Sequence, residues 1–497
     1  MSEPLGRANQ PAQTVTATVA GVEVPTGHLI GGERVDGGDR IEVSSPIDGT
    51  VLGSVPGGGA AEVDAAVAAA RSAFPAWAAL GPAGRGERLD ALAARILERT
   101  DELAAVETAD NGSLLIGNQR RVVARAAQNI SFFAAWARTL RPEPIVGEAH
   151  NSVHFDPAGV AALIVPWNAP LMLGTWKIGP ALAAGDTVVI KPPEWAPFSL
   201  SLLGQMALDV GIPPGVLNVV HGVGESAGAA LVAHPGVDRI SFTGSVPTAR
   251  LIAAAAAPNL TPVSFELGGK SPLLVMEDAD LDAAARTVAA QFVNAGQVCL
   301  AGTRLLVHRD VLDELMERVV ALAPGDTVGD PRERSTRIGP LIHPDHAARV
   351  DGFVERALAA GAKPVLGGGP HPFGPLYYSP TILTDVAQDS EIVQEEVFGP
   401  VLTLQSFASD AEAVELANGT RFGLAGTLYS TVEAHAARLT DAIVAGTLWV
   451  NCFFVRDLAA PFGGAKESGM GREGGTWSFD FFCDVKNVAV RPGSFVS

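Results

Sequence analysis

A fourfold alternation of short apolar runs with helical stretches constrains the fold of this chain more than any other feature of its sequence. The four apolar runs lie at residues 161–165, 188–190, 217–220 and 239–242. The helical stretches lie at residues 171–183, 200–210, 226–233 and 248–256. Strands that alternate with helices form parallel sheets covered on both faces, so we predict an α/β fold with a doubly wound, Rossmann-type sheet. Such sheets bind ligands beyond the carboxyl ends of their strands.

A second alternation follows residue 299 and predicts a second α/β unit that carries Cys299. Its strand-like runs are 303–307, 401–407, 427–429 and 448–450, and its helical runs are 311–322, 346–360, 411–417 and 432–445. The earlier segment 60–139 has apolar residues at three- and four-residue spacing, and three helices fit it. Segments 141–155 and 481–490 instead have the pattern of extended chain.

Composition excludes several classes of function. The 497-residue chain has a formal net charge of −19. This charge argues against a protein that binds nucleic acid and against one that binds an anionic membrane surface. Three cysteines suit a reducing cytoplasm and not a disulfide framework. Prolines 166 and 170 interrupt the most apolar stretch, 158–176, which therefore predicts a buried strand, turn and helix and not a membrane span. No His/Cys cluster has the spacing of metal ligands.

One carboxylate and one thiol, Glu266 and Cys299, have the chemistry of a base and a nucleophile. Glu266 follows the strand-like run 263–265, and two glycines after it allow a turn. Asp280 is a plausible cap for a helix that extends to Ala295 and ends at Gly296, which leaves Cys299 on a loop. The ordinary alternatives are a buried structural cysteine and a solvated turn glutamate. Spacing alone does not bring the two side chains together.

The ordered motifs of the chain closely resemble those of the aldehyde dehydrogenase superfamily. The usual dinucleotide fingerprint is absent, since glycines 222, 224 and 228 have the wrong interval. The matching motifs are PWN at 166–168, KPPE at 191–194, FTGS at 242–245, ELGGK at 266–270, GQVC at 296–299, EEVFGP at 395–400 and PFGG at 461–464. Each motif alone is weak evidence for the family. Their occurrence in the family's order, from about residue 15 to the end of the chain, is specific evidence for it.

The resemblance implies a covalent mechanism. Cys299 would attack an aldehyde carbonyl, with the Asn168 side-chain amide and the Cys299 backbone N–H stabilising the oxyanion. After hydride transfer, Glu266 would activate the water that hydrolyses the thioester. Lys177 and Glu473 match positions along a proton-exit route from this glutamate, although both could also be solvated surface charges.

The resemblance also implies a cofactor, NAD in preference to NADP. Glu194 matches the position that accepts hydrogen bonds from the adenosine ribose, where a carboxylate repels a 2′-phosphate, while the adjacent charge of Lys191 could attract one. Ala249 stands where relatives often have glycine near the pyrophosphate. The residues expected to bind the cofactor are Val165, Pro166, Trp167, Lys191, Glu194, Gly224, Phe242, Thr243, Gly244, Ser245, Leu267, Gly268, Glu396 and Phe398.

Residues 451–458 (NCFFVRDL) are similar to the branch that oxidises hydroxymuconic and 5-carboxymethyl-2-hydroxymuconic semialdehydes. In that branch Arg456 and Arg125 would hold a substrate carboxylate. Phe453 and Phe454 would line an apolar mouth, unless one of them packs in the core, and Phe462 would also contact the substrate. Arg456 could instead be a solvated loop residue paired with Asp457. The alternatives for function are a neutral or cationic aldehyde, such as a benzaldehyde or betaine aldehyde, release of an acyl-CoA product, and a catalytically inactive structural or binding homologue.

The resemblance finally implies a division of the chain. We expect a disordered tail at 1–14, an NAD-binding domain at 15–140 and 160–265, and a catalytic domain at 266–480. Segments 141–159 and 481–497 would form a small β oligomerisation arm, because exposed edge strands pair with partners. The expected assembly is a homodimer or homotetramer, in the cytoplasm and without a metal.

Overall fold

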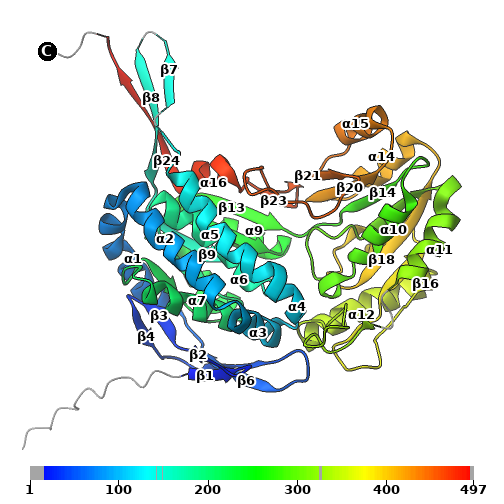
Figure 1. Ribbon diagram of the computed structural model, residues 1–497, viewed down its shortest axis with the longest axis horizontal. Coiled ribbons are helices and arrows are strands. Elements are labelled where there is room, and N and C mark those ends of the chain that lie inside the picture. The colour runs from blue at the N-terminus through cyan, green and yellow to red at the C-terminus, as the bar shows by residue number, and fades with distance from the viewer. Residues whose placement is uncertain (1–15, 142, 148, 324–326, 493–497) are drawn as a thin grey trace, which may run out of the picture.

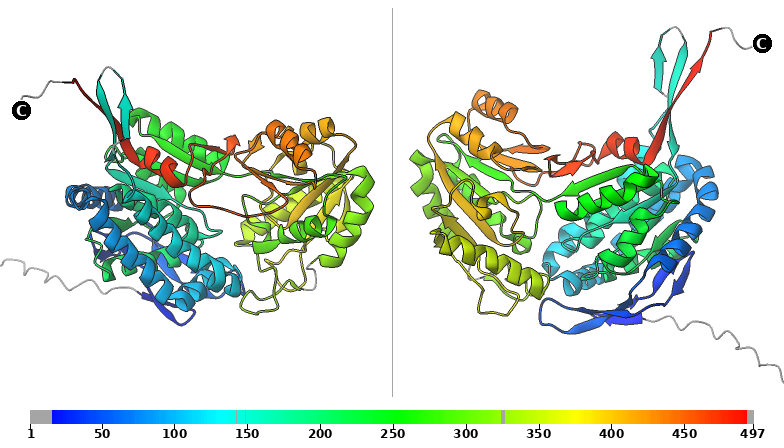
Figure 2. Two further views of the ribbon diagram at one scale, coloured as in Figure 1. Left: turned by 45° about the horizontal axis from the view of Figure 1, so that its top comes forward. Right: turned by 180° about the vertical axis from the view of Figure 1, so that it is seen from behind.

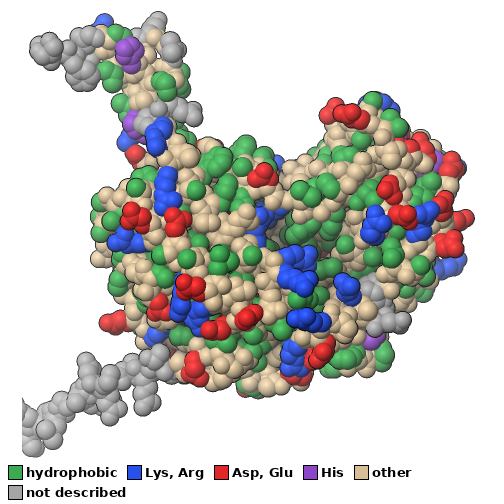
Figure 3. Space-filling view, viewed as in Figure 1, with side chains coloured by type: hydrophobic (Ala, Val, Ile, Leu, Met, Phe, Trp, Pro, Cys, Tyr) green, Lys and Arg blue, Asp and Glu red, His purple; other side chains and the backbone are tan. Residues whose placement is uncertain are grey.

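Two large sheets form two lobes that lie side by side, and a narrow arm projects from the first lobe (Figure 1). The computed structural model describes residues 16–141, 143–147, 149–323 and 327–492. The predicted tail, 1–14, lies outside the described residues, as does the end of the predicted arm, 493–497. The surface is hollowed between the two lobes, and Lys and Arg side chains gather beside the hollow (Figure 3).

The first sheet has eight strands, and its central five run parallel. Its strand order is β23 (Gly469–Met470), β13 (Val263–Leu267), β12 (Arg239–Gly244), β9 (Val160–Ile164), β10 (Thr187–Lys191), β11 (Leu217–Val219), β3 (His28–Ile30) and β4 (Glu33–Val35). One face is covered by α1 (Ala60–Ala79), η2 (Gly224–Gly228), α8 (Ala229–Ala233) and α9 (Val246–Ala256). The other is covered by α2 (Gly81–Glu98), α5 (Val123–Ala137), α6 (Pro170–Ala184) and α7 (Phe198–Asp209), as the views from two sides show (Figure 2).

The central strand β9 is apolar throughout because both of its faces are buried. Ala161 and Leu163 pack into the core under α6 and α7, while Val160 and Ala162 pack into the core under α1 and α9. A strand buried on both faces has a continuous apolar sequence. The predicted α/β class with a Rossmann-type sheet is therefore confirmed.

Several predicted helix limits are wrong. The segment 60–139 holds more than three helices, since α3 (Thr100–Asn111), α4 (Leu115–Gly117) and the π-helix η1 (Asn118–Val122) lie between α2 and α5. Asp280 does cap α10 (Leu281–Ala290), because its side chain accepts a hydrogen bond from the Ala283 N–H at 3.0 Å. That helix ends at Ala290 and not at Gly296. A short 3₁₀ segment, η4 (Val293–Gly296), follows, in which Asn294 and Ala295 have φ values of 56° and 53°.

The second sheet has seven strands, three of which the sequence patterning did not reveal. Its order is β16 (Lys363–Leu366), β17 (Thr381–Thr384), β18 (Val401–Phe407), β15 (Arg304–His308), β14 (Pro272–Val275), β20 (Ala425–Tyr429) and β21 (Thr447–Val450). The unpredicted strands are β14, β16 and β17. The helices of this lobe are α10, α11 (Leu312–Leu322), α12 (Pro344–Ala359), α13 (Glu391–Gln394), α14 (Asp410–Asn418) and α15 (Glu433–Ala442), with the 3₁₀ turn η5 (Arg309–Val311) before α11.

The projecting arm is a three-stranded antiparallel sheet formed by two distant segments. Its order is β24 (Cys483–Val490), β8 (His150–Pro157) and β7 (Glu143–Val146). Residues 481 and 482 differ from the predicted extended chain, because they end the helix α16 (Gly475–Phe482). The remaining sheets are two-stranded: β1 (Thr16–Val19) with β2 (Val22–Pro25), β5 (Arg40–Ser44) with β6 (Val51–Pro56), and β19 (Phe422–Gly423) with β22 (Ala465–Lys466).

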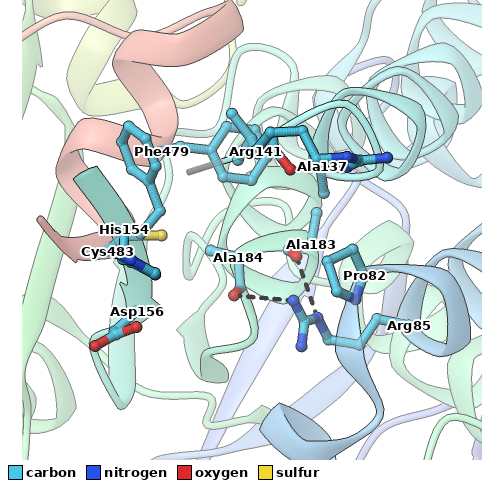
Figure 4. A pocket seen from close by; sticks show the side chains of 12 residues that line it. Pro82, Arg85, Ala137, Arg141, His154, Asp156, Ala183, Ala184, Phe479 and Cys483 are labelled. Carbon is cyan, nitrogen blue, oxygen red and sulfur yellow. Dashed lines mark hydrogen bonds between the residues drawn. The ribbon is translucent and has the colours of Figure 1, made fainter. Parts of the chain in front are cut away.

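A cavity of about 160 Å³ lies where the arm joins the first lobe (Figure 4). Arg85 lies at its wall and donates hydrogen bonds to the Ala183 and Ala184 carbonyls at the end of α6. Cys483 also lines it, and burial raises the pKa of that thiol. None of the lining residues is among the predicted site residues, so the cavity is separate from them.

Candidate active site

The predicted cofactor residues gather at one edge of the first sheet. All but Glu396 and Phe398, which follow α13 in the second lobe, end or follow the parallel strands β9, β10, β11, β12 and β13, whose carboxyl ends meet there. The chain runs from β9 outward through β10 and β11, then returns to the other side of β9 for β12 and β13. The gap between β9 and β12 is therefore the topological switch point, where such sheets bind their ligands.

Glu266 and Cys299 come from different lobes, and a glycine lies close to each of them. Glu266 lies inside β13, one residue further into the strand than the sequence pattern indicated, so the first sheet extends past the predicted boundary at 266. A Cβ on Gly269 would lie 2.8 Å from the Cys299 carbonyl oxygen, and a Cβ on Gly463 would lie 3.0 Å from Glu266 Oε1. A side chain at Gly269 would force the backbone of Cys299 to move, and one at Gly463 would press on the Glu266 carboxyl.

The loop before Cys299 is fixed by its own polar groups. The Gln297 side chain accepts from the Ile342 N–H at 3.0 Å and donates to the Asn294 carbonyl at 3.0 Å. Asn168, after β9, donates from Nδ2 to the Gln297 carbonyl at 2.9 Å. A Cβ on Gly296 would lie 2.1 Å from the Gly399 carbonyl oxygen. Asn168 is thus held two residues from Cys299, and its amide retains a second N–H.

Burial controls the ionisation of both groups. It raises the pKa of Cys299 to about 12, and the negative charges of Glu396 and Glu266 act in the same direction. Burial and the neighbouring Glu473 also raise the pKa of Glu266 well above that of an ordinary glutamate. Both Glu266 carboxyl oxygens are buried without a hydrogen-bond partner in the structure. The charge of Glu266 acts on Cys299, and Arg456 acts on both groups, so the thiol and the carboxyl share one electrostatic environment.

Lys177 and Glu473 form a fully buried ion pair beside Glu266. Lys177 Nζ lies 2.7 Å from Glu473 Oε1 and donates to Ser241 Oγ at 2.8 Å. Trp176 Nε1 donates to the other carboxylate oxygen of Glu473. The side chains of Lys177 and Glu473 are 0% and 8% exposed, which rules out the alternative that they are solvated surface charges.

Arg456 lies between two aromatic rings and not in solvent beside Asp457. Its guanidinium carbon lies 3.6 Å from the centre of the Phe462 ring and 4.4 Å from that of Trp176. Its Nε and Nη2 atoms are buried without a hydrogen-bond partner. Arg125 donates to the Arg456 carbonyl at 2.8 Å. Phe453 packs with Cys299 against a small apolar cluster that includes Phe462.

The groups expected at the cofactor lie along the same edge. Lys191 Nζ lies 2.9 Å from Glu194 Oε2 at the end of β10. Glu396 Oε1 accepts from the Gly269 N–H at 2.9 Å, and burial raises the pKa of Glu396 to about 7. Ser245 caps α9, where its side chain accepts from the Thr248 N–H at 3.3 Å.

The two rings expected near the nicotinamide, Trp167 and Phe398, lie edge to face with their centroids 5.3 Å apart. Their segments come from different lobes, since Trp167 follows β9 and Phe398 follows α13.

Sequence reasoning did not identify three residues that hold the site together: Trp176, Ser241 and Gln297. Ser241 is a small polar residue in an apolar strand, and Gln297 lies inside the motif that ends at Cys299. Both features are visible in the local sequence and could have marked these residues. Trp176 binds Glu473 across 297 residues of sequence, which no local pattern reveals.

The described ranges of the chain hold no group of three or more His, Cys, Asp or Glu side chains placed to bind a metal ion. No helix within those ranges is both long and apolar enough to span a membrane.

Comparison with known proteins identifies the family. Residues 34–488 match the aldehyde dehydrogenase family. The chain is 41% identical over 480 residues to a 2-hydroxymuconic semialdehyde dehydrogenase of Pseudomonas sp. (strain CF600), covering 93% of this chain and 99% of that protein. It is 41% identical over 469 residues to aminoaldehyde dehydrogenase 2 of Zea mays, covering 91% and 92%.

A solved structure agrees. The crystal structure of PnpE in complex with nicotinamide adenine dinucleotide superposes with a TM-score of 0.92 at 41% identity, covering 95% of this chain and 98% of that one. With the thiol and the carboxyl gathered at the switch point, these matches show that the chain belongs to the aldehyde dehydrogenase family and is an oxidoreductase that acts on aldehydes.

Proposed function

We propose that the enzyme oxidises a muconate-type semialdehyde to the carboxylic acid with NAD, through a thioester on Cys299 that Glu266 helps to hydrolyse. One observation carries the proposal: a thiol, an unpaired carboxyl and an unpaired guanidinium converge where the two lobes meet. These groups supply a nucleophile, a base and an anchor for a substrate carboxylate.

The thiolate of Cys299 attacks the aldehyde carbon, and the carbonyl oxygen becomes an oxyanion. The Cys299 backbone N–H and the free N–H of Asn168 Nδ2 stabilise that charge. NAD held at the carboxyl edge of the first sheet would supply the hydride acceptor, and loss of the hydride from the adduct on Cys299 would leave a thioester there. Glu266 then takes a proton from water as the water attacks the thioester, and the acid is released while the thiol is restored. The raised pKa of Glu266 suits a base that works near neutral pH.

Lys177 and Glu473 carry the proton from Glu266 outward in this scheme. The electrostatic influence of both residues on Glu266 supports the assignment. Ser241 bridges the pair, since it accepts from Lys177 Nζ and lies 3.3 Å from Glu473 Oε1. A proton can therefore pass between Lys177 and Glu473 while both groups stay hydrogen-bonded.

The residues at the carboxyl edge of the first sheet fit a dinucleotide. Ser245 at the start of α9 offers a helix N-terminus to the pyrophosphate, and the backbone around Gly224 is open. Glu194 is partly exposed beside the buried Lys191 and suits the ribose hydroxyls. A Cβ on Gly268 would lie 2.0 Å from Glu396 Oε2, so glycine keeps that carboxylate free for the second ribose.

On this basis we assign NAD binding to the first lobe and the nucleophile Cys299 to the second lobe, while Glu266 and Asn168 reach the site from the first. The remaining cofactor contacts proposed are Val165, Pro166, Phe242, Thr243 and Leu267, which end β9, β12 and β13 or directly follow them.

The substrate assignment depends on Arg456 and Arg125. The unpaired Nε and Nη2 of Arg456 suit a bidentate carboxylate, and the flanking rings of Phe462 and Trp176 suit a flat conjugated chain. The name of the Pseudomonas relative supports this class, whereas the maize relative favours an aminoaldehyde. A cationic amine would meet like charge at Arg456, which disfavours it here.

The test is an NAD-linked assay over a panel of muconate-type semialdehydes, neutral aromatic aldehydes, and betaine and amino aldehydes. Wild-type enzyme should give the highest kcat/KM with the carboxylated semialdehydes. Arg456→Ala should lose at least about 100-fold on these, as expected for a charge-assisted hydrogen-bonded pair, and far less on benzaldehyde. Equal losses on both classes would overturn the substrate assignment. Release of acid without added coenzyme A would exclude the acyl-transfer alternative.

We further propose that the arm joins copies of the chain into a homodimer or homotetramer. Its exposed side chains include Ile145 and Val485, and β24 and β7 are edge strands. Unpaired edges of this kind seek another strand. Light scattering of the intact chain, compared with a variant that has lysine at both positions, distinguishes these assemblies from a monomer.

A further inference from the structure

Helix α12 lies at the side of the second lobe that faces the first lobe, and aromatic contacts join the two lobes there (Figure 1). The Trp195 ring, which follows β10, stacks on the His343 ring with centroids 4.5 Å apart and planes 3° apart. The Trp167 ring, which follows β9, lies edge to face with the His346 ring at 5.2 Å. The helix is therefore packed against the lobe to which NAD binding is assigned.

The same helix binds three successive carbonyl groups of the chain that follows α13. Arg349 donates to the Glu396 and Val397 carbonyls, each at 2.7 Å. His346 Nε2 lies 2.8 Å from the Phe398 carbonyl oxygen. A carbonyl only accepts, so the imidazole carries a proton on Nε2 and donates it. Burial lowers the pKa of His346 to about 4, so the ring is neutral near neutral pH and this N–H is its one donor.

The chain that α12 binds is strained and lies against the loop of the nucleophile. Phe398 has a φ of 59°, a left-handed conformation that costs free energy in a residue with a side chain. A Cβ on the next residue, Gly399, would lie 2.8 Å from both methyl groups of Val350 on α12. On the other side, a Cβ on Gly296 would lie 2.1 Å from the Gly399 carbonyl oxygen, three residues before Cys299. The helix therefore fixes this chain next to the thiol.

We propose that α12 fixes the place of the nicotinamide ring of bound NAD relative to Cys299, with His346 as the positioning residue. Its hydrogen bond maintains the left-handed turn at Phe398, and in that turn the Phe398 ring lies 5.3 Å from the Trp167 ring. Arg349 supports the same turn through the two preceding carbonyls. The inference rests on the proposed place of Trp167 and Phe398 at the nicotinamide, and it adds residues that act on the ring through the backbone.

The test compares His346→Leu, which fills the site but cannot donate a hydrogen bond, with His346→Gln, which keeps an N–H donor. Each protein is loaded with NADH, and the time-resolved anisotropy of the nicotinamide fluorescence measures how freely the bound ring moves. The wild-type ring should rotate only with the whole protein. His346→Leu should add a fast component to the decay, and His346→Gln should largely remove it. Arg349→Met removes the other two hydrogen bonds at an exposed position, so it gives the same test if the buried variant does not fold.

The rate of NADH formation gives a second measurement. On rapid mixing with NAD and a reactive aldehyde, His346→Leu should slow the NADH burst about tenfold, because the unpaired Phe398 carbonyl no longer keeps the ring in place. Deuterium on the aldehyde carbon should slow the burst further. Alkylation of Cys299 by iodoacetamide without NAD should keep its wild-type rate. An equal slowing of this alkylation would overturn the inference, because the whole site would then be disturbed and not the ring alone.

Arg356→Met is the matched control and should behave as wild type. Arg356 lies on the same helix and, like Arg349, has its guanidinium over the Phe353 ring, but its hydrogen bonds go to Glu391 instead. An unchanged anisotropy decay in both His346→Leu and Arg349→Met, with NADH bound, would overturn the inference alone. An equal fast component in His346→Leu and His346→Gln would also overturn it, because the effect would then follow shape and not the hydrogen bond. Wild-type enzyme that binds no NADH would reject the cofactor assignment first, and this inference with it.

Discussion

Two sets of buried polar groups lie next to each other in this molecule and differ in one respect. The paired set comprises Lys177, Glu473, Ser241 and Trp176. Lys177, Ser241 and Glu473 bond one another at 2.7 to 3.3 Å, and Trp176 Nε1 donates to Glu473. The unpaired set comprises the Glu266 carboxyl, the Arg456 guanidinium and the Asn168 Oδ1 atom, which are buried without partners. The two sets adjoin, because Trp176 contacts both Glu473 and Arg456.

The difference separates groups that also stabilise the fold from groups left open to a ligand. A buried polar group without a partner costs about 1 to 3 kcal/mol of stability, so folding alone favours pairing. The paired set obeys this rule, so substitution of its members should lower stability in addition to slowing the proton transfer assigned to Lys177 and Glu473. The unpaired set violates it in the place where a substrate, a water molecule and a developing oxyanion need partners. Substitution of a member of the unpaired set should therefore mainly lower the turnover number.

The largest expected effect is on the nucleophile beside the unpaired set. Cys299→Ser should lower kcat by roughly 10⁴-fold or more, because a hydroxyl ionises far less readily than a thiol. NADH formation with a reactive aldehyde measures it. The control is Cys452→Ser, which changes a nearby half-buried thiol and should keep most of the activity. Comparable losses in the two variants would remove Cys299 from its assigned role.

The next effect concerns Glu266. Glu266→Gln should retain a burst of one NADH per active site but lose turnover by about 10²- to 10⁴-fold, because acylation proceeds while the thioester persists. Rapid-mixing fluorescence of NADH separates the two phases. The base acts when deprotonated, and its pKa is raised, so the rising limb of kcat in wild type should lie above the ordinary glutamate value of 4.5.

That limb should disappear in Glu266→Gln. Full steady-state turnover in the variant would exclude Glu266 as the base for deacylation, whatever the burst shows.

The architecture of the first lobe was predictable from sequence because its signals are local. The runs at β9, β10, β11 and β12 are apolar on both faces, and the stretches between them have helical spacing and glycine or proline at their ends. The predicted limits of these elements differ from the observed ones by only a few residues. The short strand β14 was missed because Pro272 opens it and only four residues form it.

Site residues could be predicted from the sequence only where they belong to a recognised family motif. Cys299 and Glu266 followed from ordered motifs of a known family, since their spacing does not show that they meet. The kinked segment at Asn294 and Ala295 escaped prediction because the alanine-rich run before it favours continued helix, whereas the helix ends at Ala290. The close approach of Gly296 to Gly399 depends on the completed fold. The stacking of Arg456 on Trp176 joins residues 280 positions apart and depends on the completed fold.

A smaller effect is expected on the free energy of unfolding when the paired set is disrupted. Lys177→Met should lower the free energy of unfolding by about 3 kcal/mol, because it leaves Glu473 as an uncompensated buried charge. Chemical denaturation measures it. The double variant Lys177→Met with Glu473→Gln should lose less than the sum of the two single variants, as coupled partners do.

Glu266→Leu provides the contrast for that measurement, since it removes two unpaired buried oxygens. Its unfolding free energy should equal that of wild type or exceed it by about 1 kcal/mol while activity is lost. A loss as large as that of Lys177→Met would erase the distinction between the two sets.

The smallest expected effect concerns a pair intermediate between the two sets. Lys191 is 4% exposed and bound to Glu194, yet the Glu194 side chain remains 33% exposed and available to a ligand. Glu194→Ser should lower kcat/KM for NAD about tenfold, or about 1.4 kcal/mol, because the ribose hydroxyls lose an anionic acceptor. The same change should raise the relative use of NADP, since a negative charge no longer opposes its 2′-phosphate and Lys191 is released. Glu98→Ser, at an exposed surface pair, is the control. An unchanged NAD to NADP ratio would mean that the Lys191–Glu194 pair belongs with the structural groups and not with the cofactor.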